Sequence, residues 1–149
     1  MTAGPGSGAG GSGHRGVPHT ADLRIEAWAP TRERCVAEAV KGMVGSFADV
    51  SAVRPTGTTV LEVPPGPDDD LLVAVLDEVI YRLDADGEIV LDAEVTGTPD
   101  GGLAARLRTG DAAEAREIGA VPKAISLHDL RIGADPETGE WSCTVTIDV

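Results

Sequence analysis

The chain has 149 residues, enough for one domain with its own core, and its formal net charge of −13 gives a pI near 4.4. That charge repels phosphate backbones, and aromatic residues make up only 3% of the chain, so a broad nucleic-acid surface is not expected. Because no apolar run is long enough for a bilayer and no signal-peptide pattern is present, we expect a cytoplasmic protein without a membrane partner.

The start of the chain predicts a leader and then a strand. Residues 1–13 are rich in glycine and serine, so we expect a disordered leader before a single domain over residues 14–149. From residue 21 the pattern alternates, with Leu23, Ile25 and Ala27 on one side and polar residues on the other. This alternation predicts a strand with one buried face.

Two helices are predicted next. Thr31 is the expected N-cap of the first, whose apolar residues fall on one stripe: Val36, Val40, Met43, Val44 and Phe47. A short strand over residues 58–63 stops at a proline-rich segment, residues 64–67. Asp68, Asp69 and Asp70 then suit the positive end of a second helix, whose apolar stripe is Leu72, Val75, Leu76, Val79, Ile80 and Leu83.

The remainder of the chain predicts strands and turns. Turns at residues 86–87 and 99–102 bracket a strand over residues 89–95 and lead into a second alternating segment, which indicates a hairpin. Residues 111–117 fit a loop or one helical turn, residues 121–132 have strand character, and a last strand starts after residue 139. We therefore expect an α+β fold, a layered domain with two helices packed on a mainly antiparallel sheet of about six strands.

The cysteines have a structural interpretation. Cys35 and Cys143 are far apart in the sequence, form no Cys-x-x-Cys pair and occupy apolar positions of their own elements. Both are predicted to be small core residues in a reducing compartment.

The chemistry of interest lies at the two ends of the folded region. Asp22 opens the first predicted strand, and Asp148 and Val149 close the last, with both aspartates on the non-core face. If these strands pair antiparallel, two carboxylates and the α-carboxylate of Val149 converge into an oxygen-only site for Ca²⁺ or Mg²⁺. The alternative is that they are solvated acids at strand ends, which spacing alone favours.

Two other residues are candidates for contacts. His19 can be a ligand, an acid–base group or a polar residue at the strand entry. Lys123 is one of only two lysines, with Lys41, and is either a solubilising cation on an edge strand or a contact to an acidic group or phosphate of a partner. A metal-dependent hydrolase built on His19 and Asp22 needs further ligands, and the sequence offers none at a recognised spacing.

These segments together resemble the archease family over residues 14–149. The carriers are the run from His19 to Asp22 with the following strand, the Leu-Asp-Glu-Val-Ile-Tyr run over residues 76–81, Lys-Ala-Ile-Ser from Lys123, and the terminal Ile-Asp-Val. The sequence departs from the family pattern before Lys123, where the usual Gly-Thr-Glu-Val reads Gly-Ala-Val-Pro over residues 119–122 and loses a hydroxyl and a carboxylate. It departs also at Arg15, where an aromatic residue is more usual.

The resemblance implies a non-catalytic cofactor that promotes guanylylation and multiple turnover of a GTP-dependent RtcB-type RNA ligase, in tRNA splicing or RNA repair. It also implies that Asp22, Asp148 and Val149 hold the divalent cation and that Lys123 is functional. A strongly acidic protein fits a basic RNA enzyme better than RNA itself, so docking on the ligase is expected. A chaperone-like module with a structural cation and another RNA-processing partner is the alternative.

Overall fold

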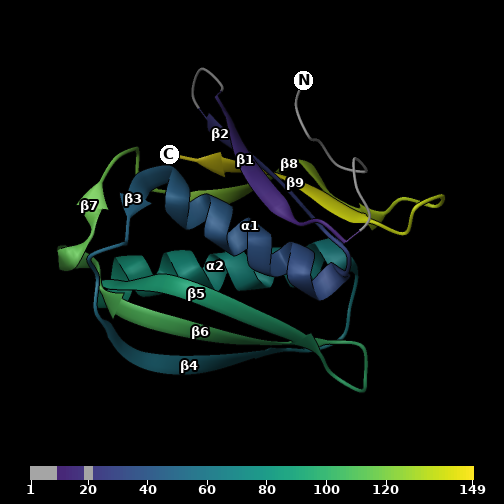
Figure 1. The fold of residues 1–149 in the computed structure, drawn as a ribbon, viewed down its shortest axis with the longest axis horizontal. Coiled ribbons are helices and arrows are strands. Elements are labelled where there is room, and N and C mark those ends of the chain that lie inside the picture. Colours follow the sequence, from purple (N-terminus) through teal and green to yellow (C-terminus); the bar gives the residue numbers. More distant parts are fainter. Residues whose placement is uncertain (1–9, 19–21) are drawn as a thin grey trace.

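The structure, a computed structural model, describes residues 10–18 and 22–149. Two helices, α1 (Arg32–Phe47) and α2 (Asp68–Asp86), form a layer between two antiparallel sheets (Figure 1). The fold is α+β with two helices on antiparallel sheets, as predicted, but the strands divide between the two sides of the helix layer instead of forming one sheet. Each helix therefore has to be apolar toward both sides.

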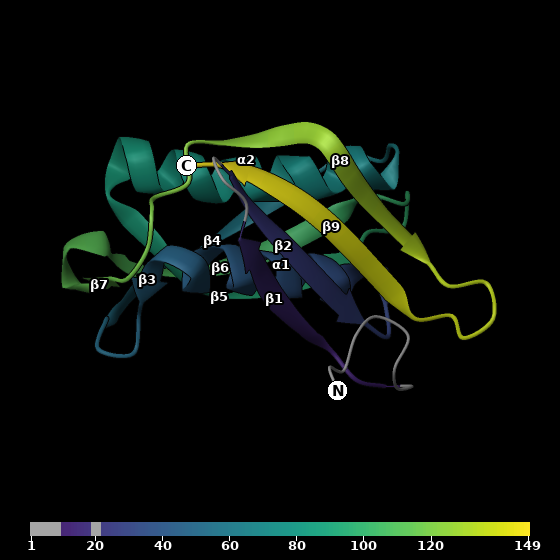
Figure 2. The same ribbon diagram turned by 90° about the horizontal axis from the view of Figure 1, so that it is seen from above.

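The four-stranded sheet has the order β1-β2-β9-β8, and Figure 2 shows β9 between β2 and β8. Its strands are β1 (Gly13–Pro18), β2 (Asp22–Ala29), β9 (Trp141–Asp148) and β8 (Ala124–Ala134). The three-stranded sheet contains β4 (Pro55–Val63), β6 (Leu103–Asp111) and β5 (Glu88–Gly97), in that order. A small ribbon pairs β3 (Ala48–Asp49) with β7 (Arg116–Glu117), after a 3₁₀ turn at Ala112–Glu114.

The first helix begins where the sequence predicts. The Thr31 hydroxyl accepts a hydrogen bond from the Arg34 N–H at 3.2 Å, which satisfies one of the free donors of the first turn. The predicted apolar stripe is buried, with Val36 and Met43 each 1% exposed. Capping and burial therefore agree on the position and orientation of α1.

We expect Thr31→Ala to lower the free energy of unfolding by about 1 kcal/mol, because the Arg34 N–H loses its acceptor. Urea denaturation of the full chain measures the change. Thr31→Ser keeps the hydroxyl and is expected to stay close to the wild type. Equal midpoints for the alanine and serine variants would show that the cap contributes nothing.

The second helix ends at a glycine. Gly87 has φ = 64°, and its N–H donates to the Leu83 carbonyl at 3.2 Å. A residue in this left-handed conformation is a common helix C-cap, and glycine adopts it without steric cost. The predicted turn is thus in place, and it terminates α2 immediately before β5.

The core includes both cysteines, as predicted. Cys35 on α1 and Cys143 on β9 are 0% and 1% exposed. The pKa of the Cys35 thiol is raised by its hydrogen bond with Cys143 and by burial, so the thiol stays protonated. Among residues 10–18 and 22–149, no helix has the length and apolar character needed to cross a membrane.

Several strands differ from the prediction: the short pair β3 and β7 was not predicted, and β1 and β8 differ as follows. The strand β1 was not predicted, since Gly13 and Gly16 interrupt its pattern, and it is held by tertiary contacts: His14 Nδ1 lies 2.8 Å from Glu38 Oε1 of α1. The strand β8 runs from Ala124 to Ala134, so it starts and ends later than predicted. Before it, Pro122 is buried, and the Lys123 N–H donates to the Asp148 carbonyl of the last strand.

Candidate functional site

Asp22 and Asp148 face each other across two neighbouring strands. The antiparallel register of β2 and β9 makes them Cα partners, which is the pairing on which the predicted convergence of the carboxylates depended. Their neighbours Leu23 and Ile147 pack on the core, so both aspartates point to the outer face of the sheet. Directly opposed residues have Cβ atoms about 4.5–5.5 Å apart, a separation that one hard cation can bridge.

The donor set fits a divalent cation by its chemistry, since it consists of oxygens. Val149 follows Asp148 and lies half-buried beside the core, next to the two carboxylates along the chain. In the described ranges no three His, Cys, Asp or Glu side chains gather into a metal cluster, so a cation here needs oxygens besides these two side chains. His19, the other candidate, lies outside the described residues.

Lys123 is brought to the same end of the sheet. Its backbone N–H donates to the Asp148 carbonyl at 2.8 Å, and the next residue, Ala124, is the Cα partner of Asp148 on the other side. The Lys123 side chain is exposed. Three predicted residues from three separate strands or strand ends therefore lie together: Asp22, Lys123 and Asp148.

Beside Lys123 lies a groove of about 620 Å³ between α2 and the segment 121–123. One wall is the outward face of α2, and its lining residues are Asp77, Ile80, Tyr81, Leu83, Asp84, Val121, Pro122 and Lys123. Tyr81, the only tyrosine of the chain, is 61% exposed there, and burial raises the pKa of the Asp77 carboxyl. The groove combines apolar side chains with carboxylates, which suits a ligand with apolar and basic groups.

The sequence did not predict this groove. The periodicity of α2 put Asp77, Tyr81 and Asp84 off the apolar stripe, but nothing in the local pattern says which segment lies opposite them. The only signal in the sequence was the rarity of two residue types, because the single tyrosine and one of the two lysines both line this groove.

The segment before Lys123 is fixed by close backbone contacts. The N–H groups of Ile118 and Gly119 both donate to the Phe47 carbonyl at the end of α1, at 2.8 and 3.3 Å. A Cβ on Gly119 would lie 2.3 Å from the Ser46 carbonyl oxygen, so only glycine fits. With the Lys123 bond to Asp148, the segment is held at both ends.

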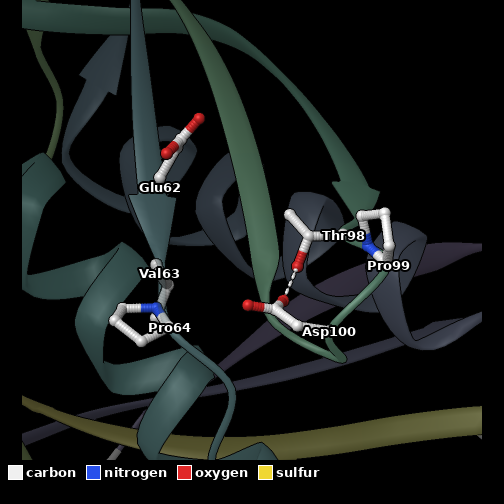
Figure 3. Close-up of a pocket in the computed structure, with 6 residues that line it drawn as sticks. All are labelled: Glu62, Val63, Pro64, Thr98, Pro99 and Asp100. Atoms are coloured by element: carbon white, nitrogen blue, oxygen red, sulfur yellow. Dashed lines mark hydrogen bonds between the residues drawn. The ribbon is translucent and has the colours of Figure 1, made fainter.

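A second cavity, of about 630 Å³, lies at the other sheet (Figure 3). It is lined by Glu62, Val63 and Pro64 at the end of β4 and by Thr98, Pro99 and Asp100 of the β5–β6 turn. Figure 3 shows the Thr98 hydroxyl bonded to Asp100, and this bond and the Gly102 N–H lower the pKa of the Asp100 carboxyl. Asp100 is thus satisfied by its own turn, and no predicted site residue lines this cavity.

Comparison with known proteins places these features in a family. Residues 14–149 match the model of the Archease protein family. The chain is 50% identical over 138 residues to the probable protein archease of Mycobacterium tuberculosis, covering 93% of this chain and 75% of the relative. A protein archease from Methanopyrus kandleri is 26% identical over 137 residues, with 89% and 96% covered.

The fold has a solved counterpart. The solution structure of Methanobacterium thermoautotrophicum protein 1598 superimposes with a TM-score of 0.70, covering 92% of this chain and 99% of the other. At 21% sequence identity, this likeness establishes the fold alone. It supports the arrangement of helices between sheets described above.

Proposed function

This chain belongs to the archease family, and on that premise we propose that it is a non-catalytic cofactor of an RtcB-type RNA ligase. In this role it promotes guanylylation and multiple turnover of the GTP-dependent ligase in tRNA splicing or RNA repair, in the cytoplasm. The observation that carries the proposal is the meeting of Asp22, Asp148 and the Lys123 main chain at one end of the four-stranded sheet.

The cation-binding part of the proposal rests on oxygen donors. Asp22 and Asp148, with an oxygen of Val149, would hold Ca²⁺ or Mg²⁺ across the ends of β2 and β9. The bound charge would offset the repulsion between the two carboxylates and order this end of the sheet. Because Lys123 donates to Asp148, ordering the strand end also fixes the position of Lys123.

The docking part rests on charge. A protein with a net charge of −13 is a poor ligand for RNA and a good one for a basic protein surface. We assign the groove beside Lys123 to a segment of the ligase that carries apolar side chains together with a basic group. Its apolar side chains would meet Ile80 and Pro122, and its basic group would meet Asp77 or Asp84. The exposed side chain of Lys123 would contact an acidic group of the ligase.

The test is RNA ligation by the cognate ligase under multiple-turnover conditions, with and without this protein, together with the yield of guanylylated ligase. We expect more turnovers and more guanylylated enzyme when the protein is present. Equal progress curves would exclude the ligase-cofactor function and favour a chaperone-like role with another partner. Phosphatase activity of the protein alone, lost in Asp22→Ala, would instead identify a metal-dependent hydrolase.

Lys123→Ala is expected to reduce the stimulation of ligation at least about tenfold, because the loss of one partner of an interface charge pair costs about 2 kcal/mol or more. The fold and the cation response should stay unchanged, since Lys123 bonds to Asp148 through its backbone. Lys41→Ala is the matched control: Lys41 is the other lysine and lies on α1, 3.6 Å from Asp92. Equal losses in the two variants would show that Lys123 has no specific contact.

A further inference from the structure

The outer face of the four-stranded sheet carries a ladder of polar side chains. The register places Arg15, Glu26, Thr144 and Arg131 in one row across all four strands. The next row includes Arg24, opposite Thr146. Three of the chain's arginines therefore gather on one face of a protein with a net charge of −13. The same face also carries Glu26, Asp22 and Asp148, so basic and acidic side chains are interspersed on it.

Two of these arginines, Arg24 and Arg131, lack a close carboxylate among the described residues. Among the half-buried arginines of the described ranges, Arg15, Arg32 and Arg82 each lie within 3.0 Å of a carboxylate oxygen. Arg24 is equally half-buried, but its closest ion-pair distance is 3.9 Å, from Nη2 to Glu26 Oε2. The Glu26 carboxylate is already 2.9 Å from Arg15 Nε, whose guanidinium stacks on Trp28.

The Nε atom of Arg24 is buried and has no hydrogen-bond partner in the part of the chain that the structure describes. A buried donor without an acceptor lowers the stability of the folded protein, because its hydrogen bond to water is lost and not replaced. Arg24 is half-buried, whereas the other arginines without a close carboxylate in the described residues are exposed to solvent: Arg34, Arg106, Arg108 and Arg131. The Arg24 guanidinium therefore has hydrogen-bond donors that the described residues leave unused.

Arg24 shares a cavity of about 390 Å³ with Arg131 and Thr144. No carboxylate of the described residues comes within ion-pair distance of Arg131, and its Nη2 lies 3.5 Å from the buried Thr144 hydroxyl. The bulge of β8 between Ser126 and Arg131 forms another wall, with Leu130 and Asp129. The Asp129 carboxylate is turned to His128, 3.3 Å from its Nε2. Two guanidinium groups and a hydroxyl thus line one cavity, and its one acid, Asp129, is paired with His128.

We propose that this cavity binds the phosphate group of a small anion, either inorganic phosphate or a mononucleotide, between Arg24 and Arg131 with Thr144 at its base. Guanidinium groups on different strands can donate to different oxygens of a tetrahedral group, which a planar carboxylate matches less well. The small cavity and the negative charge elsewhere on the molecule disfavour a nucleic-acid strand. This site is independent of the ligase-cofactor function.

The experiment titrates the full chain with inorganic phosphate, GMP and guanosine at constant ionic strength, using calorimetry and amide NMR shifts. We expect saturable binding of phosphate and GMP, no binding of guanosine, and shifts at Arg24, Arg131 and Thr144. Equal affinities for phosphate and GMP would identify the phosphate group alone as the ligand. Tighter binding of GMP would identify a nucleotide site built on the same phosphate contacts.

Arg24→Gln and Arg131→Gln are each expected to weaken phosphate binding at least about tenfold, because each removes one charge-assisted hydrogen bond. Arg106→Gln, an exposed arginine of β6 in the other sheet, should bind as the wild type does. The side chain of Arg131 is exposed, so its variant keeps the test valid even if Arg24→Gln unfolds. The proposal is overturned if no saturable binding occurs, if both variants bind like the wild type, or if glutarate binds and phosphate does not.

Discussion

Asp148→Asn is expected to abolish the stabilisation that a divalent cation gives to this protein. A ligand that binds only the folded state at one hundred times its Kd raises the free energy of unfolding by about 2.7 kcal/mol. With one of the two opposed carboxylates neutralised, the proposed site loses half of its side-chain charge. Asp22→Asn should behave in the same way, and both variants should lose the stimulation of the ligase.

Without the cation, the same substitution is expected to change the free energy of unfolding in the opposite direction. Like charges directly opposed on a sheet destabilise it, by about 0.2–1 kcal/mol for a cross-strand pair, so each variant should be slightly more stable than the wild type in chelator. Urea denaturation with EDTA, Ca²⁺ or Mg²⁺ measures both effects. Glu62→Gln, an exposed acid on the other sheet, is the control. A cation response in Asp148→Asn equal to the wild type would exclude the proposed cation site.

The sequence predicted the face that Asp22 and Asp148 occupy, because the face depends on alternation alone, but the pairing of their strands was a condition of the cation site. Ile25 and Ala27 on one strand, and Cys143 and Val145 on the other, define a buried face, and a one-residue slip would bury the charges instead. Burial therefore sets which face each aspartate takes. Matching the two apolar sets excludes a shift by an odd number of residues, and the structure supplies the exact register.

The division of the strands into two sheets was not predictable from local pattern. A helix sandwiched between two sheets needs apolar residues toward both, and in α2 the predicted stripe already contains them: Leu72, Val75, Leu76 and Val79 are all buried. A stripe of that kind serves one sheet or two equally well. Only the long-range pairings, β4 with β6 and β2 with β9, distinguish the two arrangements.

The groove and the outer-face cavity depend on the same long-range information. Arg24 and Arg131 are more than a hundred positions apart in the sequence, and the bulge that brings the second into the cavity follows no period. The arginines are visible in the sequence, but their lack of a close carboxylate is a property of the packed sheet. Such sites become apparent only when register and burial are known.

Gly119→Ala is expected to destabilise the protein by about 1–3 kcal/mol and to reduce ligase stimulation beyond what the lost stability explains. The new Cβ would lie 2.3 Å from the Ser46 carbonyl oxygen, so the backbone has to shift, as for an over-packed core position. The shift would break the bonds to the Phe47 carbonyl and move the segment that forms one wall of the groove. Lys123 would be displaced with that segment.

Gly133→Ala is the matched control, because a Cβ on that β8 glycine meets no atom within 4 Å. Its free energy of unfolding should match the wild type or exceed it slightly, since alanine has less freedom than glycine in the unfolded chain. Urea denaturation gives the stability of both variants, and ligation at a temperature where both are folded gives the function. If Gly119→Ala is destabilised but stimulates fully, the segment stabilises the fold without positioning Lys123. If it equals Gly133→Ala in both measurements, the close contact of residue 119 with Ser46 imposes no constraint.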